Sequence, residues 1–108
     1  MVKQLILVAL LAAAVAGCND VPRARVRNKL ADKINVSFQP SSGNTLNVND
    51  VASGTTSGYI NVPEGMLRIH ASTSKTNPAD VNFTFVKGKS YTVEVDSGPP
   101  SVMTVIED

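Results

Sequence analysis

The residues of this chain that could bind a metal ion are few and widely spaced. His70 is the only histidine, and Met66, Met103 and Asp80 are conceivable partners for it as ligands of an ion such as copper. Metal sites normally show clustered His, Cys or carboxylate side chains, and no such spacing is present here. We therefore expect His70 to make a solvated or cross-strand hydrogen bond and we expect no cofactor. Metal binding through His70, Met66 and Met103 is the weaker alternative.

Hydrolytic chemistry has equally little support. A serine nucleophile needs a base within hydrogen-bonding reach and a third group that orients the base. Ser57, in "TTSGY", has a glycine neighbour but no strand-to-helix turn around it. The oxygens of "NVND" at 47–50 lack the acidic density of a calcium loop and are typical of a turn. The sequence therefore predicts that this protein is not an enzyme.

The single cysteine, Cys18, directly follows a short apolar segment. The preceding residues hold one charge, Lys3, and then an unbroken apolar run of 13 residues from Leu5 to Gly17. As a helix this run would be about 20 Å long, too short for a bilayer core of about 30 Å. A basic start, a short apolar stretch and small residues at its end are typical of an export signal.

The sequence "VAGC" at 15–18 resembles the lipobox of bacterial lipoproteins, with Val15 where leucine is usual. The resemblance implies that residues 1–17 are a signal peptide that is removed, and that the thiol of Cys18 carries a diacylglycerol (palmitate-type lipidation). A buried cysteine near the end of a core helix is the alternative. Asn19 after the cysteine is similar to enterobacterial signals for the outer membrane. We therefore expect a lipid anchor in the bacterial cell envelope, at the outer rather than the inner membrane.

A row of basic residues begins five positions after Cys18: Arg23, Arg25, Arg27 and Lys29. A strand would place all four on one face, where they would either protect a sheet edge or contact anionic headgroups or an acidic partner. Residues 91–108, by contrast, carry four negative charges and no positive one. Without the signal the charges balance, and so neutral a domain is not expected to bind nucleic acid.

Polar and apolar residues alternate with a period of two along the rest of the chain, which predicts β-strands and no helix. Strands are expected at 23–30, 34–39, 66–72, 81–85 and 91–96, with shorter ones at 46–48 and 60–62. Turn sequences separate them at 40–44, 63–65, 76–80, 87–89 and 97–100. About seven or eight short strands predict a small antiparallel β-sandwich over residues 23–108, joined to Cys18 by a tether at 18–22.

Two segments, "ASGTTSGYINVPEGMLRIHAS" (52–72) and "FVKGKSYTVEV" (85–95), resemble the bacterial exported β-domains of the domain of unknown function 4397 family. The resemblance implies an immunoglobulin- or transthyretin-like sandwich and brings no catalytic residues. We expect an envelope lipoprotein whose non-catalytic domain binds an envelope protein or the cell wall, through polar strand edges and loops 41–58 and 73–80. The alternative is an accessory lipoprotein that binds a small ligand or a metal ion such as copper.

Overall fold

The computed structural model describes residues 20–75, 77–97 and 101–108, and within these ranges it contains strands and no helix. The expected signal peptide at 1–17 and the lipidation site Cys18 lie outside the described residues. No helix of the described part of the chain is long and apolar enough to cross a membrane. The strands are β1 (Arg23–Asn28), β2 (Ile34–Pro40), β3 (Leu46–Val51), β4 (Ile60–Asn61), β5 (Gly65–Ser72), β6 (Val81–Phe85), β7 (Ser90–Asp96) and β8 (Val102–Glu107).

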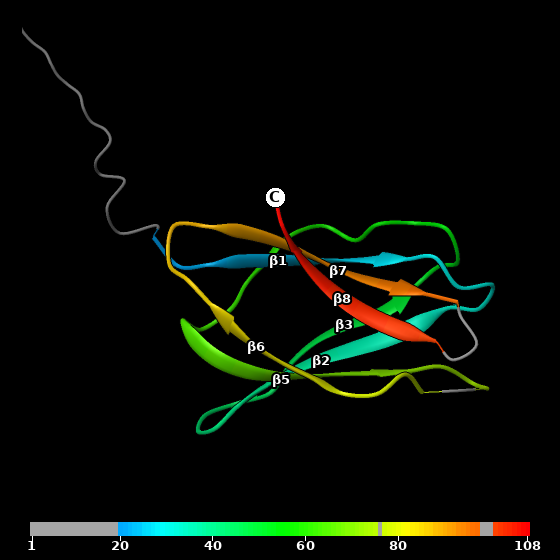
Figure 1. The fold of residues 1–108 in the computed structure, drawn as a ribbon, viewed down its shortest axis with the longest axis horizontal. Helices are drawn as coiled ribbons and strands as arrows, with labels where there is room; N and C mark the ends of the chain where they lie inside the picture. The colour runs from blue at the N-terminus through cyan, green and yellow to red at the C-terminus, as the bar shows by residue number, and fades with distance from the viewer. Residues whose placement is uncertain (1–19, 76, 98–100) are drawn as a thin grey trace, which may run out of the picture.

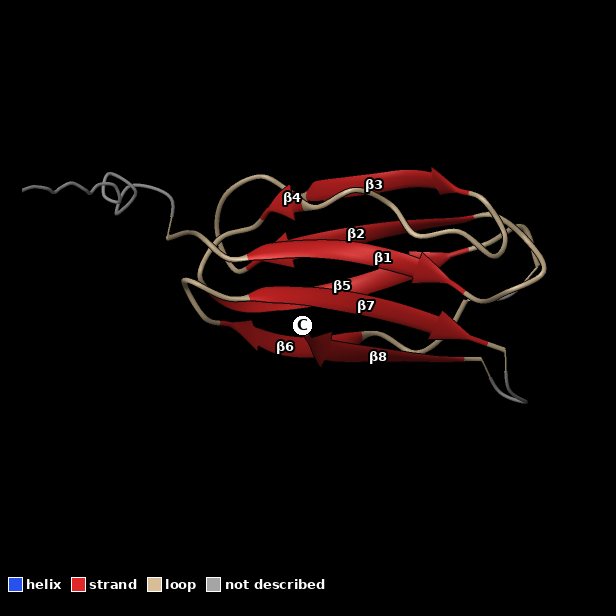
Figure 2. Cartoon of the chain, turned by 90° about the horizontal axis from the view of Figure 1, so that it is seen from above, coloured by secondary structure: helices blue, strands red, loops and turns tan. Residues whose placement is uncertain are grey.

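The strands form two four-stranded sheets that pack face to face. The first sheet has the order β4-β1-β7-β8 and the second the order β3-β2-β5-β6. Figure 1 shows β1 and β7 in one layer above β2 and β5 in the other, and Figure 2 shows the same layers from a second side. The predicted β-sandwich is therefore confirmed.

One strand pair departs from the antiparallel arrangement expected from the sequence. β1 runs parallel to β7, with Arg23 opposite Ser90 and Asn28 opposite Val95, whereas the other strand pairs are antiparallel. The chain crosses to the second sheet directly after β1, so β1 has no hairpin partner and is free to pair with a strand far along the sequence. The first sheet is therefore mixed.

The inner faces of both sheets carry the alternating apolar side chains and make one core. Part of this core is an aromatic cluster of Phe38, Phe83, Phe85 and Tyr91, whose rings meet edge to face with centroids 5.0–6.1 Å apart. The Tyr91 hydroxyl, although buried, accepts a hydrogen bond from the Val86 amide at 3.0 Å, so its polar atom is satisfied.

The segment 52–59 lies along β1 and protects it. The amide of Asn28 donates to the Thr55 carbonyl at 2.9 Å, and the amide of Ser57 donates to the Val26 carbonyl at 2.8 Å. The Ser57 hydroxyl accepts from the Val26 amide at 2.9 Å, replacing a backbone acceptor. Consequently β1 is not a sheet edge, and interpreting its basic row as protection of an edge is wrong.

The short strand expected at 46–48 is longer in the structure than in the prediction, since β3 continues to Val51.

The two ends of the sandwich are built from different connections. At the N-terminal end, β1 begins beside the β6–β7 turn, the start of β5 and the β2–β3 turn (Figure 1). At the opposite end, here called the distal end, lie the β1–β2 connection and the described parts of the β5–β6 and β7–β8 connections. The predicted contact loop 41–58 is therefore divided, because 41–45 lies at the N-terminal end and 46–51 is β3. Ser53 and Gly54 bond Leu30 and Asn28 at the distal end, where 73–80 also lies.

Candidate functional site

The basic row of β1 faces matching side chains of β7, because the parallel register sets residues 23, 25 and 27 opposite 90, 92 and 94. Arg23 donates to the Ser90 hydroxyl and Arg25 to the Thr92 hydroxyl, each at 3.0 Å. Arg27 forms an ion pair of 3.0 Å with Glu94.

The other acidic residues near the end of the sequence extend this pairing. Lys29 lies 3.7 Å from Asp96 and 4.0 Å from Glu94, and Arg25 lies 3.8 Å from Asp108. The basic row of β1 and the acidic side chains of residues 91–108 thus lie side by side and neutralise each other. The row as a whole is not an unpaired cationic surface, which weakens the case for headgroup contact through it.

Tyr59 and Asp108 lie beside the basic row of β1 and contact its side chains. The guanidinium carbons of Arg23 and Arg25 lie 4.7 and 4.8 Å from the centroid of the Tyr59 ring, which is within cation–π range. The Tyr59 hydroxyl donates to Asp108 at 2.5 Å, and the Thr92 hydroxyl donates to the same carboxylate at 2.7 Å. The Tyr59 hydrogen bond is the main cause that lowers the pKa of Asp108, and the same bond raises the pKa of Tyr59. Sequence reasoning missed this pair because 49 residues separate its members.

His70 makes a hydrogen bond of the kind expected of it. Its Nδ1 lies 2.7 Å from the carboxylate of Asp80, which also lies 3.7 Å from Arg68 Nε on the same outer face of β5. Asp80 is one of the conceivable metal partners of His70, and the two are indeed adjacent. The carboxylate, however, already contacts both His70 and Arg68.

The two candidate methionines do not join this pair. Met66 is exposed on the outer face of β5, whereas Met103 is buried on β8 in the other sheet. Four strand positions separate Met66 from His70, roughly 13 Å along an extended strand. Among the described residues, no group of three His, Cys, Asp or Glu side chains is placed to hold a metal ion.

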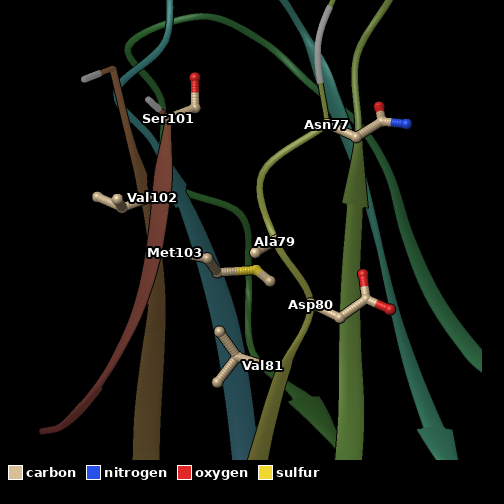
Figure 3. A pocket seen from close by; sticks show the side chains of 7 residues that line it. All are labelled: Asn77, Ala79, Asp80, Val81, Ser101, Val102 and Met103. Atoms are coloured by element: carbon tan, nitrogen blue, oxygen red, sulfur yellow. The ribbon is translucent and has the colours of Figure 1, made fainter. Parts of the chain in front are cut away.

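A cleft of about 380 Å³ opens between β6 and β8 at the distal end. These strands are the edge strands of their sheets on the same side of the sandwich, and no hairpin joins them. In Figure 3 the Met103 side chain extends from β8 toward Ala79, and the Asp80 carboxylate points away from Met103. The lining residues are Asn77, Ala79, Asp80, Val81, Ser101, Val102 and Met103, and most of the lining surface is apolar.

The lining of this cleft offers both apolar and hydrogen-bonding groups. Met103 supplies a polarisable thioether, Ala79 and Val81 supply small apolar surfaces, and Ser101 and Asn77 supply hydrogen-bonding groups at the rim. The one carboxylate of the lining, Asp80, is engaged by His70. Pro78, which cannot donate a ladder hydrogen bond, lies in the segment 77–80 just before β6.

A smaller hollow of about 170 Å³ adjoins the cleft at the same end and shares Ser101 with it. It is lined by Leu30, Ala31, Asp32, Thr73, Lys75 and Ser101. Asp32 accepts a hydrogen bond from the Ser74 hydroxyl at 2.5 Å, and this bond is the main cause that lowers its pKa. The distal end therefore carries two neighbouring hollows, and the ionised carboxylate of Asp32 lines the smaller one.

Comparison with known proteins identifies a similar fold. No family model matches the chain, and no curated protein matches it. Among solved structures, the C-terminal domain of AlgF from P. aeruginosa is similar over 82% of this chain and 99% of that domain, with a TM-score of 0.60 and 18% sequence identity. At that identity the likeness shows the fold alone, that of a small β domain, and the resemblance to the domain of unknown function 4397 family stays a prediction.

Proposed function

We propose that this protein is a lipid-anchored protein of the bacterial cell envelope whose β-sandwich binds another envelope protein, or the cell wall, through its distal end and without catalysis. The anchor is inferred from "VAGC" at 15–18. The outer membrane is the favoured location, on the basis of Asn19.

The observation that carries the proposal is the placement of the β6–β8 cleft. Residues 20–22 lead into β1 at one end of the sandwich, whereas the cleft and its neighbouring hollow lie at the other end. A protein anchored at Cys18 would hold its N-terminal end at the membrane and direct the cleft away from it. The apolar lining can receive a partner's side chain, and the edge strands β6 and β8 offer backbone groups beside it.

Site-directed photocrosslinking in the envelope tests this orientation. A photoreactive amino acid replaces Ala79 at the cleft in the full chain, and a matched variant carries it at Ser42 in the β2–β3 turn, at the N-terminal end. We expect a discrete crosslinked partner from position 79 and not from position 42. Identical products from both positions, or none from position 79, would contradict binding through the distal end.

The anchor itself is tested by mass spectrometry of the protein purified from membranes. We expect an N-terminal peptide that begins at Cys18 and carries acyl chains. A free thiol at position 18 with residues 1–17 still attached would remove the proposed location.

The second candidate function is the binding of a small ligand in the β6–β8 cleft. It is favoured by the volume of about 380 Å³, within the usual range for small-molecule sites, and by the thioether of Met103. A ligand of the folded state raises the melting temperature, so a thermal-shift screen with small apolar compounds distinguishes this function from partner binding.

A further inference from the structure

We propose that the N-terminal end of the sandwich lies directly on the lipid bilayer, with Val21, Met66 and Val86 inserted at its interface. This inference rests on the proposed acylation of Cys18. It concerns a different surface from the β6–β8 cleft and from the basic row of β1, and it specifies how the domain is oriented on the membrane.

The chain is held by the sandwich from Asp20 onward. The Asp20 carbonyl accepts a hydrogen bond of 2.5 Å from the Gly88 amide in the β6–β7 turn. The Arg23 amide donates to the Lys89 carbonyl at 3.1 Å, and the Pro22 carbonyl accepts from the Val62 amide at 3.0 Å. Residues 20–23 are therefore bonded to segments of the sandwich on both sides and do not form a loose linker.

Little chain is left between this point and the lipid. Cys18 precedes Asp20 by two residues, and a fully extended chain spans at most about 3.6 Å per residue. Two residues of chain can therefore extend at most about 7 Å beyond Asp20. Because a diacylglycerol on the Cys18 sulfur must enter the bilayer, the N-terminal end is brought to the level of the headgroups.

Exposed large apolar side chains are found at the tip of this end. Val21, Met66 and Val86 are 46%, 64% and 44% exposed. Val21 adjoins Asp20, and Val86 lies in the turn whose Gly88 amide bonds Asp20. Met66 is opposite Thr84 in the β5–β6 pair, so it lies diagonally across from Val86. Val21 therefore lies just before β1 of the first sheet, whereas Val86 and Met66 lie beside each other on the second sheet, all at the end where the chain leads to Cys18.

The charges at this end balance, so the expected contact is mainly apolar. Lys89 pairs with Glu107 at 3.1 Å, whereas Lys87 and Arg23 have no acidic partner within the described ranges. Asp20 and Glu64 are exposed at the same end and offset the charges of Lys87 and Arg23. Amphipathic surfaces of this kind lie at the boundary of headgroups and acyl chains, where lysine stems extend toward water. Binding driven in this way does not require anionic lipid.

Depth-dependent fluorescence quenching tests the orientation in the native, acylated protein. Full-length variants Val86→Cys and Met66→Cys are purified from membranes, with Val102→Cys as the matched control. Val102 is 48% exposed and lies at the distal end. Since the Cys18 thiol is acylated, a thiol-reactive fluorophore labels the introduced cysteine alone. The proteins are reconstituted in phosphatidylcholine vesicles that contain nitroxide lipids, and circular dichroism confirms the β-fold of each.

We expect a blue shift and quenching for the probes at positions 86 and 66 but not at position 102, with no change on adding salt or phosphatidylglycerol. Equal signals at 86 and 102, or no quenching at 86 and 66, would overturn the inference. So would quenching that requires phosphatidylglycerol and disappears in salt, since it would indicate electrostatic contact. Mass spectrometry of each preparation first establishes the acyl chains on Cys18, so a failure of the anchor is distinguished from a failure of the orientation.

Discussion

The hydroxyl of Tyr59 donates a 2.5 Å hydrogen bond to the carboxylate of Asp108 and thereby links the segment before β4 to the residue that follows β8. Both residues lie over the outer face of the first sheet, where Arg25 contacts each of them. The pair joins two segments that flank β1 and β7, and it completes the network that neutralises the basic row.

Replacing Tyr59 by phenylalanine should raise the pKa of Asp108 toward its ordinary value of 3.8, because the Tyr59 hydrogen bond is the main cause of the lowered pKa. A carboxylate with a lowered pKa stabilises the folded state above its unfolded pKa, and this contribution is lost as the pH falls through the folded pKa. Tyr59→Phe should therefore reduce stability at neutral pH, and its effect should diminish as the pH falls below 3.8 and through the lowered pKa of Asp108. NMR titration measures the pKa, with Asp32 as an internal control that should not change.

Replacing Arg23, Arg25 and Arg27 together by serine should change binding to anionic vesicles only slightly. The reason is that these side chains already contact Ser90, Thr92, Glu94 and Asp108. Sedimentation of the unacylated Cys18→Ser protein with phosphatidylglycerol vesicles measures this. A large, salt-sensitive loss of binding would instead show that the row contacts headgroups.

Asn28 is the buried polar side chain whose removal should destabilise the domain most. Its amide nitrogen donates to the Asp32 and Val51 carbonyls at 2.8 and 2.9 Å, and its oxygen accepts from the Leu30 amide at 2.9 Å. Because a buried group left without a partner costs about 1–3 kcal/mol, Asn28→Ala should lower the free energy of unfolding by at least about 2 kcal/mol.

The matched control is Asn35→Ala. Asn35 accepts one exposed hydrogen bond of 2.8 Å from the Asp50 amide, so its removal should cost about 1 kcal/mol or less. Urea denaturation compares the two variants. Equal losses would contradict the role of Asn28 in joining β1 to β3 of the other sheet.

Copper or zinc should leave the melting temperature of the protein unchanged, because Met66 lies four strand positions from His70 and the Asp80 carboxylate points away from Met103 (Figure 3). Differential scanning fluorimetry with and without each metal, and with His70→Ala as the control, measures this. A metal-dependent rise that His70→Ala abolishes would restore the metal-binding alternative.

The strands could be predicted because alternation is a local property of the sequence. Val26, Phe38 and Val93 point inward at every second position whatever their partners are, since successive side chains of a strand point to opposite faces. The segment 52–59 could not be predicted in the same way. Its backbone bonds depend on β1, which lies about 30 residues earlier in the chain.

The sequence by itself determined the all-β class, the inward face of most strands, and the unequal charges of its two ends. The tertiary structure decided that β1 and β7 run side by side, so that Arg27 meets Glu94 across 67 residues of chain. It also decided that the β6–β8 cleft and the start of β1 lie at opposite ends. The physical reason is that the partner and the direction of each strand are selected when the apolar faces of both sheets are buried against each other. A period-two alternation shows which face of a strand is buried, but it does not show which strand lies beside it.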